Sequence, residues 1–160
     1  MASSWQDDVP ALLDYAADMG IEIRFIELMR TGTQAGWADR EYVSAEVVRT
    51  WLGARQGIRG DSEGSPGPAR RTWMEWCGRE VRVGWITPRS RPFCADCDRL
   101  RLDPRGTLRR CLMDPEPFTL DEQLRTVPEG DVRRGLRRYI ERKIAPASME
   151  LRLPMLSMGG

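Results

Sequence analysis

The chain has 160 residues, of which 41% are hydrophobic and 31% are charged, and its formal net charge is +1. This length fits one ordinary domain or a small domain plus a fragment, and the charge gives no sign of a nucleic-acid partner. The sequence has no histidine, which excludes histidine-based triads and histidine-ligated zinc. It also lacks the roughly 20-residue apolar run of a membrane span and the pattern of a signal peptide, so we expect a cytoplasmic protein without a membrane partner.

The first part of the chain reads as a helix followed by a strand. Apolar residues with helical spacing predict a helix over residues 5–19, closed by Gly20. Alternating apolar residues then predict a strand over residues 21–29. A helix, a glycine and a strand form one unit of an α/β sheet or barrel. Because only one such unit is present, the strand is predicted to lack a neighbour, and we expect residues 1–55 to be poorly stable alone, to dimerise or to dock on a partner.

The next segments alternate between loops and one helix. Residues 31–40 contain glycine and are predicted to form a loop. Ser44 is a suitable N-cap for a helix that extends to about residue 55. Residues 57–70 are rich in Gly, Ser and Pro, which predicts a flexible linker.

The second half of the chain begins with a hairpin. Residues 71–87 predict two strands with a turn at Gly78. Residues 118–125 predict a short helix, and residues 131–144 a longer one. The last 16 residues show no period, and residues 154–160 read as a free tail.

Three of the four cysteines lie close together in the sequence. Cys94 and Cys97 form a Cys-x-x-Cys pair, a common way to place two thiolates on one soft metal or iron–sulfur centre. A predicted strand over residues 99–102 and a turn over residues 103–106 would bring Cys111 back to the same place. In a chain without a secretory signal, such cysteines indicate metal or redox chemistry rather than disulfides.

The cysteines alone leave the nature of the centre open. Three thiolates suit a 4Fe-4S cluster with one open iron. A structural zinc ion prefers four protein ligands, and Cys77 would be the fourth, although this residue reads better as a core or exposed thiol. Buried thiols without a metal are a third interpretation.

Two arginines alternate with two leucines beside the cysteine pair. On a strand, Arg99 and Arg101 would share one face while Leu100 and Leu102 pack on the other. Guanidinium groups beside an open metal site suit a phosphate-bearing ligand. A polar outer face of a hairpin explains the same pattern, and the residues alone do not decide between the two.

This stretch resembles the C-terminal cluster motif of the GTP 3′,8-cyclases of molybdenum cofactor biosynthesis, which are lyases of the radical S-adenosylmethionine (SAM) family. The residues that carry the resemblance are Phe93, Cys94, Cys97, Arg99–Leu102, Gly106, Leu108 and Cys111–Leu112. Three further stretches agree with the family in the same order, namely Arg24–Met29, which is similar to its sixth barrel strand, Val83–Pro88 and the terminal pair Gly159–Gly160.

The resemblance implies an α/β (α+β) fold in three parts. Residues 1–56 would be the C-terminal part of a partial TIM barrel of the radical SAM type. Residues 57–70 would be the flexible linker. Residues 71–160 would form a cluster-binding and GTP-binding domain with a β-hairpin sheet, C-terminal helices and a Gly-Gly tail.

The resemblance also implies roles for individual residues. The ligands of a 4Fe-4S cluster, whose open iron binds the guanine of GTP, would be Cys94, Cys97 and Cys111. The GTP-binding strand would be formed by Arg99, Leu100 and Arg101. Met29 would contact SAM, and the catalytic tail that assists the radical step would end in Gly159 and Gly160.

One departure limits the predicted activity. The family carries a Cys-x-x-x-Cys-x-x-Cys motif for the SAM-cleaving cluster, and the present sequence has no match to it. Conversion of GTP to 3′,8-cyclo-GTP would then need a SAM-cleaving barrel half supplied in trans, and the chain would have that half or a second copy of itself as partner. The alternatives are a stand-alone, non-catalytic iron–sulfur and nucleotide-binding module, and a structural zinc module.

Overall fold

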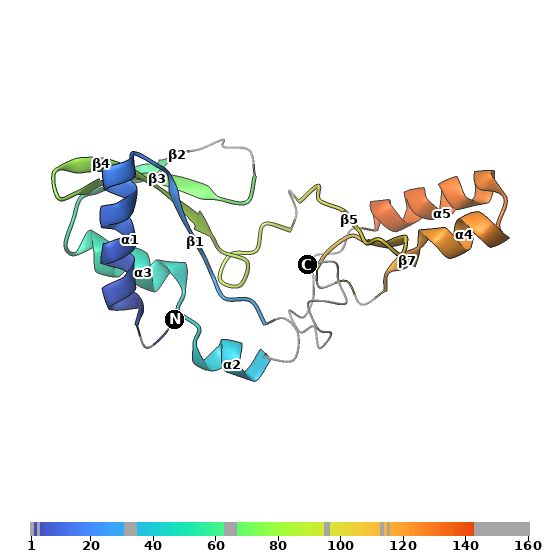
Figure 1. Cartoon of the computed structure of the whole chain (residues 1–160), viewed down its shortest axis with the longest axis horizontal. Helices are drawn as coiled ribbons and strands as arrows, with labels where there is room; N and C mark the ends of the chain where they lie inside the picture. Colours follow the sequence, from blue (N-terminus) through green and yellow to red (C-terminus); the bar gives the residue numbers. More distant parts are fainter. Residues whose placement is uncertain are drawn as a thin grey trace. The chain divides into compact units, whose positions relative to one another are not determined.

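The described chain forms two compact units that mix helices and strands (Figure 1). The computed structural model describes residue 2 and residues 4–30, 35–62, 67–94, 97–112, 114 and 116–142. The first unit comprises Met1–Met29 and Trp37–Phe93, and the second comprises Arg30–Gly36 and Cys94–Gly160. The predicted α+β class is confirmed. None of the helices in these described ranges has the length and hydropathy of a membrane-spanning segment.

The first unit is built on a four-stranded sheet with the order β1-β4-β3-β2. Its strands are β1 (Ile23–Ile26), β2 (Ile58–Ser62), β3 (Arg70–Trp76) and β4 (Arg79–Ile86). β1 runs parallel to β4, whereas the β4–β3 and β3–β2 pairs are antiparallel. The sheet therefore combines a hairpin with a strand that comes from about 60 residues earlier in the chain.

Two sequence-based predictions for this unit are wrong. The strand predicted to lack a neighbour pairs with β4, from Ile23 opposite Val83 to Ile26 opposite Ile86. Part of the predicted flexible linker over residues 57–70 is the strand β2, which pairs with β3. The two errors have different causes. The partner of β1 lies about 60 residues later in the chain and leaves no local signal, whereas β2 has the composition of a loop and is made regular by its partner in the sheet.

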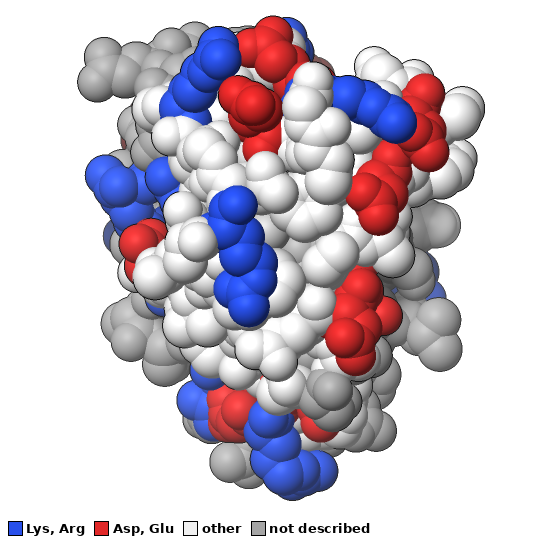
Figure 2. All heavy atoms as spheres, turned by 90° about the vertical axis from the view of Figure 1, so that its left-hand side faces the viewer, with Lys and Arg blue, Asp and Glu red and all other residues white. Residues whose placement is uncertain are grey.

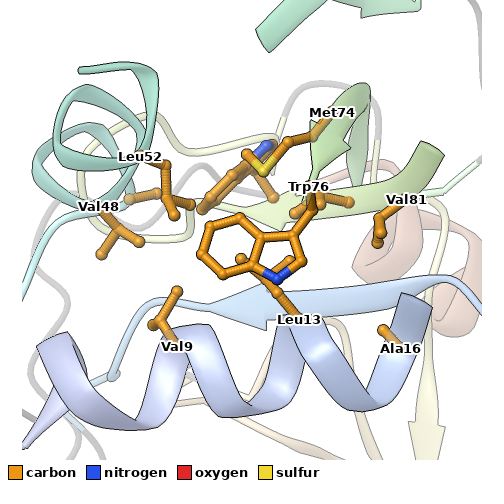
Figure 3. Close-up of a cluster of buried hydrophobic side chains, with 11 residues drawn as sticks. Val9, Leu13, Ala16, Val48, Leu52, Met74, Trp76 and Val81 are labelled. Atoms are coloured by element: carbon orange, nitrogen blue, oxygen red, sulfur yellow. The ribbon is translucent and has the colours of Figure 1, made fainter. Parts of the chain in front are cut away.

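One apolar core joins the sheet to two helices, α1 (Trp5–Met19) and α3 (Ala45–Gly53). Figure 3 shows side chains of α1, α3 and β3 meeting around Trp76. Leu13 of α1 and Leu52 of α3 are fully buried there. Gly20 ends α1 in the left-handed conformation, and the Ser44 hydroxyl caps α3 by accepting a hydrogen bond from the Val47 amide, as predicted.

The β3–β4 hairpin has the predicted turn. Cys77 and Gly78 occupy its two central positions with φ angles of 48° and 77°. Positive φ angles at both positions are typical of a type I′ turn. The Cys77 side chain is exposed at the tip of this hairpin, in the first unit. Of the two expectations for this thiol, core or exposed, the second is confirmed.

One face of the first unit carries charged groups around an uncharged area, and a Lys or Arg side chain lies in the middle of that area (Figure 2). This face points to the left in Figure 1, where α1 lies. On α1, Leu12, Tyr15 and Met19 are exposed and lie three and four residues apart, so they share one helix face. That residues 1–55 dimerise or dock on a partner stays a prediction.

The second unit contains a small antiparallel sheet and two helices. Its strands are β5 (Arg101–Leu102), β6 (Thr107–Arg109) and β7 (Phe118–Thr119), in that order across the sheet. The helices are α4 (Leu120–Thr126) and α5 (Glu129–Glu141). The first two residues of the helix predicted over residues 118–125 belong to the strand β7 instead. The helix α2 (Ala35–Arg40), most of which belongs to the first unit, lies where a loop was predicted.

The turn predicted between β5 and β6 is confirmed. The Asp103 carboxylate accepts hydrogen bonds from the backbone N–H groups of Arg105 and Thr107, both at 2.9 Å. Gly106 has a φ of 75° and donates its N–H to the Asp103 carbonyl. An added Cβ at Gly106 would lie 2.7 Å from the Asp121 Cβ, so this position requires glycine for two reasons.

A buried carboxylate fixes the carboxyl end of the parallel strand pair. Glu27 follows β1 and is 4% exposed. It accepts hydrogen bonds from the backbone N–H groups of Ala45, Arg89 and Ser90 at 3.0, 3.0 and 2.8 Å. Burial raises the pKa of Glu27, but the hydrogen bonds from the Ser90 hydroxyl and these amides outweigh it and leave the pKa below the ordinary value. One side chain thus joins β1, the start of α3 and the turn after β4.

We expect Glu27→Gln to lower the free energy of unfolding by about 2 kcal/mol at pH 7. The Gln side chain would place an N–H donor against the backbone N–H groups that now donate to the carboxylate. The folded-state pKa of Glu27 lies below its ordinary value of 4.5, so its contribution is present above that pH and is lost as the pH falls through the folded-state pKa. The difference between the two proteins should therefore shrink in acid.

Urea unfolding followed by circular dichroism at pH 7 and at pH 3 measures this difference. Glu46→Gln, which changes an exposed carboxylate in α3, is the matched control and should stay within about 0.5 kcal/mol of the parent at both pH values. Equal effects of the two substitutions at pH 7 would show that Glu27 has no special role.

Candidate functional site

A backbone hydrogen bond joins the two cysteines of the Cys-x-x-Cys pair at the beginning of the second unit. The Cys97 backbone N–H donates to the Cys94 carbonyl at 3.3 Å. Both side chains are half-buried. The Arg99 Nε donates to the Cys97 Sγ at 3.4 Å, which places the positive charge of the guanidinium group beside this sulfur. A cation in contact with a sulfur favours its thiolate form, the form that binds metal.

Cys111 lies two residues after β6 and is also half-buried, in the same unit as Cys94 and Cys97. Across the residues that the structure describes, no three Cys, Asp, Glu or His side chains form a group that could hold a metal ion. That Cys111 shares one centre with the other two sulfurs stays a prediction. By chemistry the donor set still fits an iron–sulfur cluster, because it offers three sulfur ligands and a neighbouring cation.

The strand predicted after the cysteine pair is shorter than expected. Only Arg101 and Leu102 are in β5, opposite Arg109 and Leu108 of β6. Leu100 and Leu102 are 41% and 60% exposed, so the prediction that they pack on one face is wrong. β5 is an edge strand, and two strand residues offer no sheet surface for packing. Arg99 is exposed and Arg101 is half-buried.

A buried polar network beside Cys111 was not predicted. The Arg110 guanidinium binds both carboxylate oxygens of Asp114, with Nε–Oδ2 and Nη2–Oδ1 distances of 2.9 Å. The Tyr139 hydroxyl lies 2.6 Å from Asp114 Oδ2. Burial raises the pKa of Asp114, but hydrogen bonds from Arg110 and Tyr139 outweigh it and lower the pKa to about 2. The only sequence signal was an Arg four residues before an Asp, outside any predicted helix.

Met29 lies beyond the carboxyl end of β1, beside a cavity of about 350 Å³. The residues that line this cavity are Ile26, Glu27, Leu28, Met29, Glu41 and Val43. All of them belong to the first unit. The predicted catalytic pair, Gly159 and Gly160, lies outside the described residues.

The sequence of this chain matches a known protein family. Residues 21–149 match the family model described as Molybdenum Cofactor Synthesis C. GTP 3′,8-cyclase 1 of Pseudomonas aeruginosa is 35% identical over 141 residues, which cover 87% of this chain and 43% of the relative. The GTP 3′,8-cyclase of Streptomyces coelicolor is 34% identical over 163 aligned positions, which cover 96% of this chain and 47% of the relative.

A third relative matches a shorter part of the chain. The GTP 3′,8-cyclase of Stenotrophomonas maltophilia is 39% identical over 106 residues, which cover 66% of this chain and 32% of the relative. The chain thus spans less than half the length of these curated relatives. The family match itself covers most of the chain, including all three cysteines of the second unit. The chain therefore belongs to the Molybdenum Cofactor Synthesis C family.

Proposed function

We propose that this chain is the substrate-side part of a GTP 3′,8-cyclase and acts in the cytoplasm in molybdenum cofactor biosynthesis. Cys94, Cys97 and Cys111 would hold a 4Fe-4S cluster, and GTP would bind beside it. The observation that carries the proposal is the contact of Arg99 Nε with Cys97 Sγ at 3.4 Å, within the segment that matches the family. This contact joins a metal-binding sulfur to a group that recognises phosphate.

The arginines supply the electrostatic part of the site. Arg99 is exposed and Arg101 half-buried, so both guanidinium groups have access to a bound anion. A guanidinium donates two parallel hydrogen bonds to phosphate oxygens, which fixes the phosphate in orientation as well as in position. Their proposed role, together with Leu100, is to hold GTP with its triphosphate on the arginine side. The bound cluster would supply an iron with an open coordination position for the guanine base.

The small number of buried apolar side chains in the described part of the second unit supports a bound cluster. Among its described residues, the buried apolar side chains are those of Leu108 and Val132. The other buried side chains are the charged groups of Arg109, Arg110 and Asp114. Small units with little apolar burial are commonly stabilised by a metal site or a disulfide. A cluster would give this unit a stabilising element that its apolar side chains do not provide.

Formation of 3′,8-cyclo-GTP also requires cleavage of SAM, for which the sequence carries no three-cysteine motif of the family type. We assign this step to a barrel half supplied in trans. Residues 1–56 would complete that barrel, and Met29, beside its cavity of about 350 Å³, would contact SAM. The terminal pair Gly159–Gly160 would assist the radical step. Without such a partner, the chain would act as a non-catalytic iron–sulfur and nucleotide-binding module.

We expect protein purified and reconstituted without oxygen to contain about four iron and four sulfide per chain. Cys94→Ser, Cys97→Ser and Cys111→Ser should each lose most of this iron, because a thiolate ligand is replaced by a hydroxyl. Cys77→Ser is the matched control and should retain it, because Cys77 lies on the hairpin tip of the other unit. Stoichiometric zinc with little iron would instead support a structural zinc site. Equal loss of iron in Cys77→Ser would contradict a site made by Cys94, Cys97 and Cys111 alone.

Calorimetry tests the arginine assignment. The double variant Arg99→Ala/Arg101→Ala should bind GTP at least about 10-fold more weakly, since two hydrogen-bonding cations are removed. Arg105→Ala combined with Arg125→Ala removes the same charge at exposed positions of the same unit and should change the affinity less than about twofold. Equal losses of GTP affinity in the two double variants would show that only the net charge of the unit matters. That result would refute the assignment of Arg99 and Arg101 to the GTP-binding strand.

Mixing experiments separate the cyclase part from the non-catalytic module. The cluster-loaded chain, incubated without oxygen with the SAM-cleaving half of a relative, GTP, SAM and a reductant, should form 3′,8-cyclo-GTP. Either half alone should form none. If the loaded chain binds GTP and no product appears by mass spectrometry with the added half, the binding-module alternative is correct.

A further inference from the structure

We infer that the Arg110–Asp114 ion pair, together with Tyr139, positions Cys111 for the cluster. The inference rests on the proposed function, in which Cys111 is the third ligand. Arg110 directly precedes this cysteine, and Asp114 follows it by three residues. The side chains of Arg110 and Asp114 are 7% and 3% exposed, so the pair that flanks Cys111 in the sequence is buried.

The backbone around Cys111 is closed by a set of short contacts. The two guanidinium–carboxylate hydrogen bonds of 2.9 Å join the ends of the loop over residues 110–114. The Asp114 N–H donates to the Cys111 carbonyl at 3.2 Å. Arg109 Nη1 donates to the Asp114 carbonyl at 3.2 Å. A loop held by contacts of both its side chains and its backbone leaves Cys111 few alternative conformations.

The loop is in turn anchored to α5. The Tyr139 hydroxyl lies 2.6 Å from Asp114 Oδ2 and 3.0 Å from the Leu108 carbonyl, so it connects the helix to β6 and to the ion pair. Arg110 Nη1 donates to the Arg142 carbonyl at 2.7 Å, just after the helix ends. The Arg110 guanidinium also lies over the Tyr139 ring, 4.2 Å from its centroid. Cys111 is therefore tied to a 13-residue helix.

This anchoring has a chemical consequence for a metal site. Groups that hydrogen-bond around a ligand fix its orientation, and their loss typically weakens metal binding by about 10-fold to 100-fold. Tyr139 and Asp114 are positioning residues in this sense, because they act through the Cys111 loop. They set the place of the third sulfur before any cluster is bound.

The test compares Tyr139→Phe with Tyr15→Phe in the cluster-loaded chain. Tyr139→Phe removes one hydroxyl and keeps the ring, whereas Tyr15 is 60% exposed on α1 and serves as the control. With a ferrous chelator and no oxygen, we expect iron release to be about 10-fold faster in Tyr139→Phe and unchanged in Tyr15→Phe. The helix signal in circular dichroism should be the same in both variants.

A second readout does not require the cluster. In cluster-free protein, iodoacetamide should modify Cys111 at least about threefold faster in Tyr139→Phe than in the parent, with Cys94 and Cys97 unchanged, because loosening of the loop exposes one thiol. Peptide mass spectrometry resolves the three sites. The double substitution Arg110→Met/Asp114→Leu removes the ion pair without leaving an unpaired buried charge, and it should raise the Cys111 rate further.

The outcomes separate this inference from the function on which it rests. If the parent chain holds no iron, the proposed function fails, while the alkylation rates still test the loop. The inference is overturned if Tyr139→Phe and the double variant both release iron or alkylate Cys111 at the parental rate. It is also overturned if all three cysteines become reactive together as the helix signal falls, because that result indicates general unfolding.

Discussion

The second unit depends on one buried ion pair. Arg110 and Asp114 meet through two hydrogen bonds of 2.9 Å where other small units have an apolar core. Removing one partner of such a pair costs about 3–5 kcal/mol, because the other charge stays buried. The Tyr139 hydroxyl also contacts the Asp114 carboxylate and links it to α5. The same contacts join the residues on either side of Cys111, so the folding of this unit and the position of a proposed metal ligand depend on the same atoms.

The first unit buries a charged side chain in a different way. Its core is apolar, and its buried carboxylate, Glu27, is satisfied mainly by backbone N–H groups of Ala45, Arg89 and Ser90. This arrangement closes the carboxyl end of the parallel pair β1–β4, the end where open α/β sheets place their ligands. The cavity beside Met29 lies at this end. A rigid framework therefore supports the position at which we propose SAM contact.

Local patterns in the sequence predicted much of the fold. The helix that ends at Gly20, the hairpin with its turn at Gly78 and the turn at Asp103 depend on neighbours in the chain. The β1–β4 pairing joins residues about 60 positions apart, and β2 has the composition of a loop, so neither leaves a local signal. The cysteine pair and the family were recognisable because they depend on residue identity and spacing. The Arg110–Asp114 pair was not, because its partners meet only in the folded loop.

The central claim is that three cysteines hold a cluster with an open iron that receives GTP. Electron paramagnetic resonance of the reduced, cluster-loaded chain tests it most directly, because the signal of an iron–sulfur cluster changes when a ligand binds its iron. We expect added GTP to shift the g-values in a saturable manner, at the concentrations at which calorimetry shows binding. A spectrum that stays unchanged while GTP fully occupies its site would contradict the account.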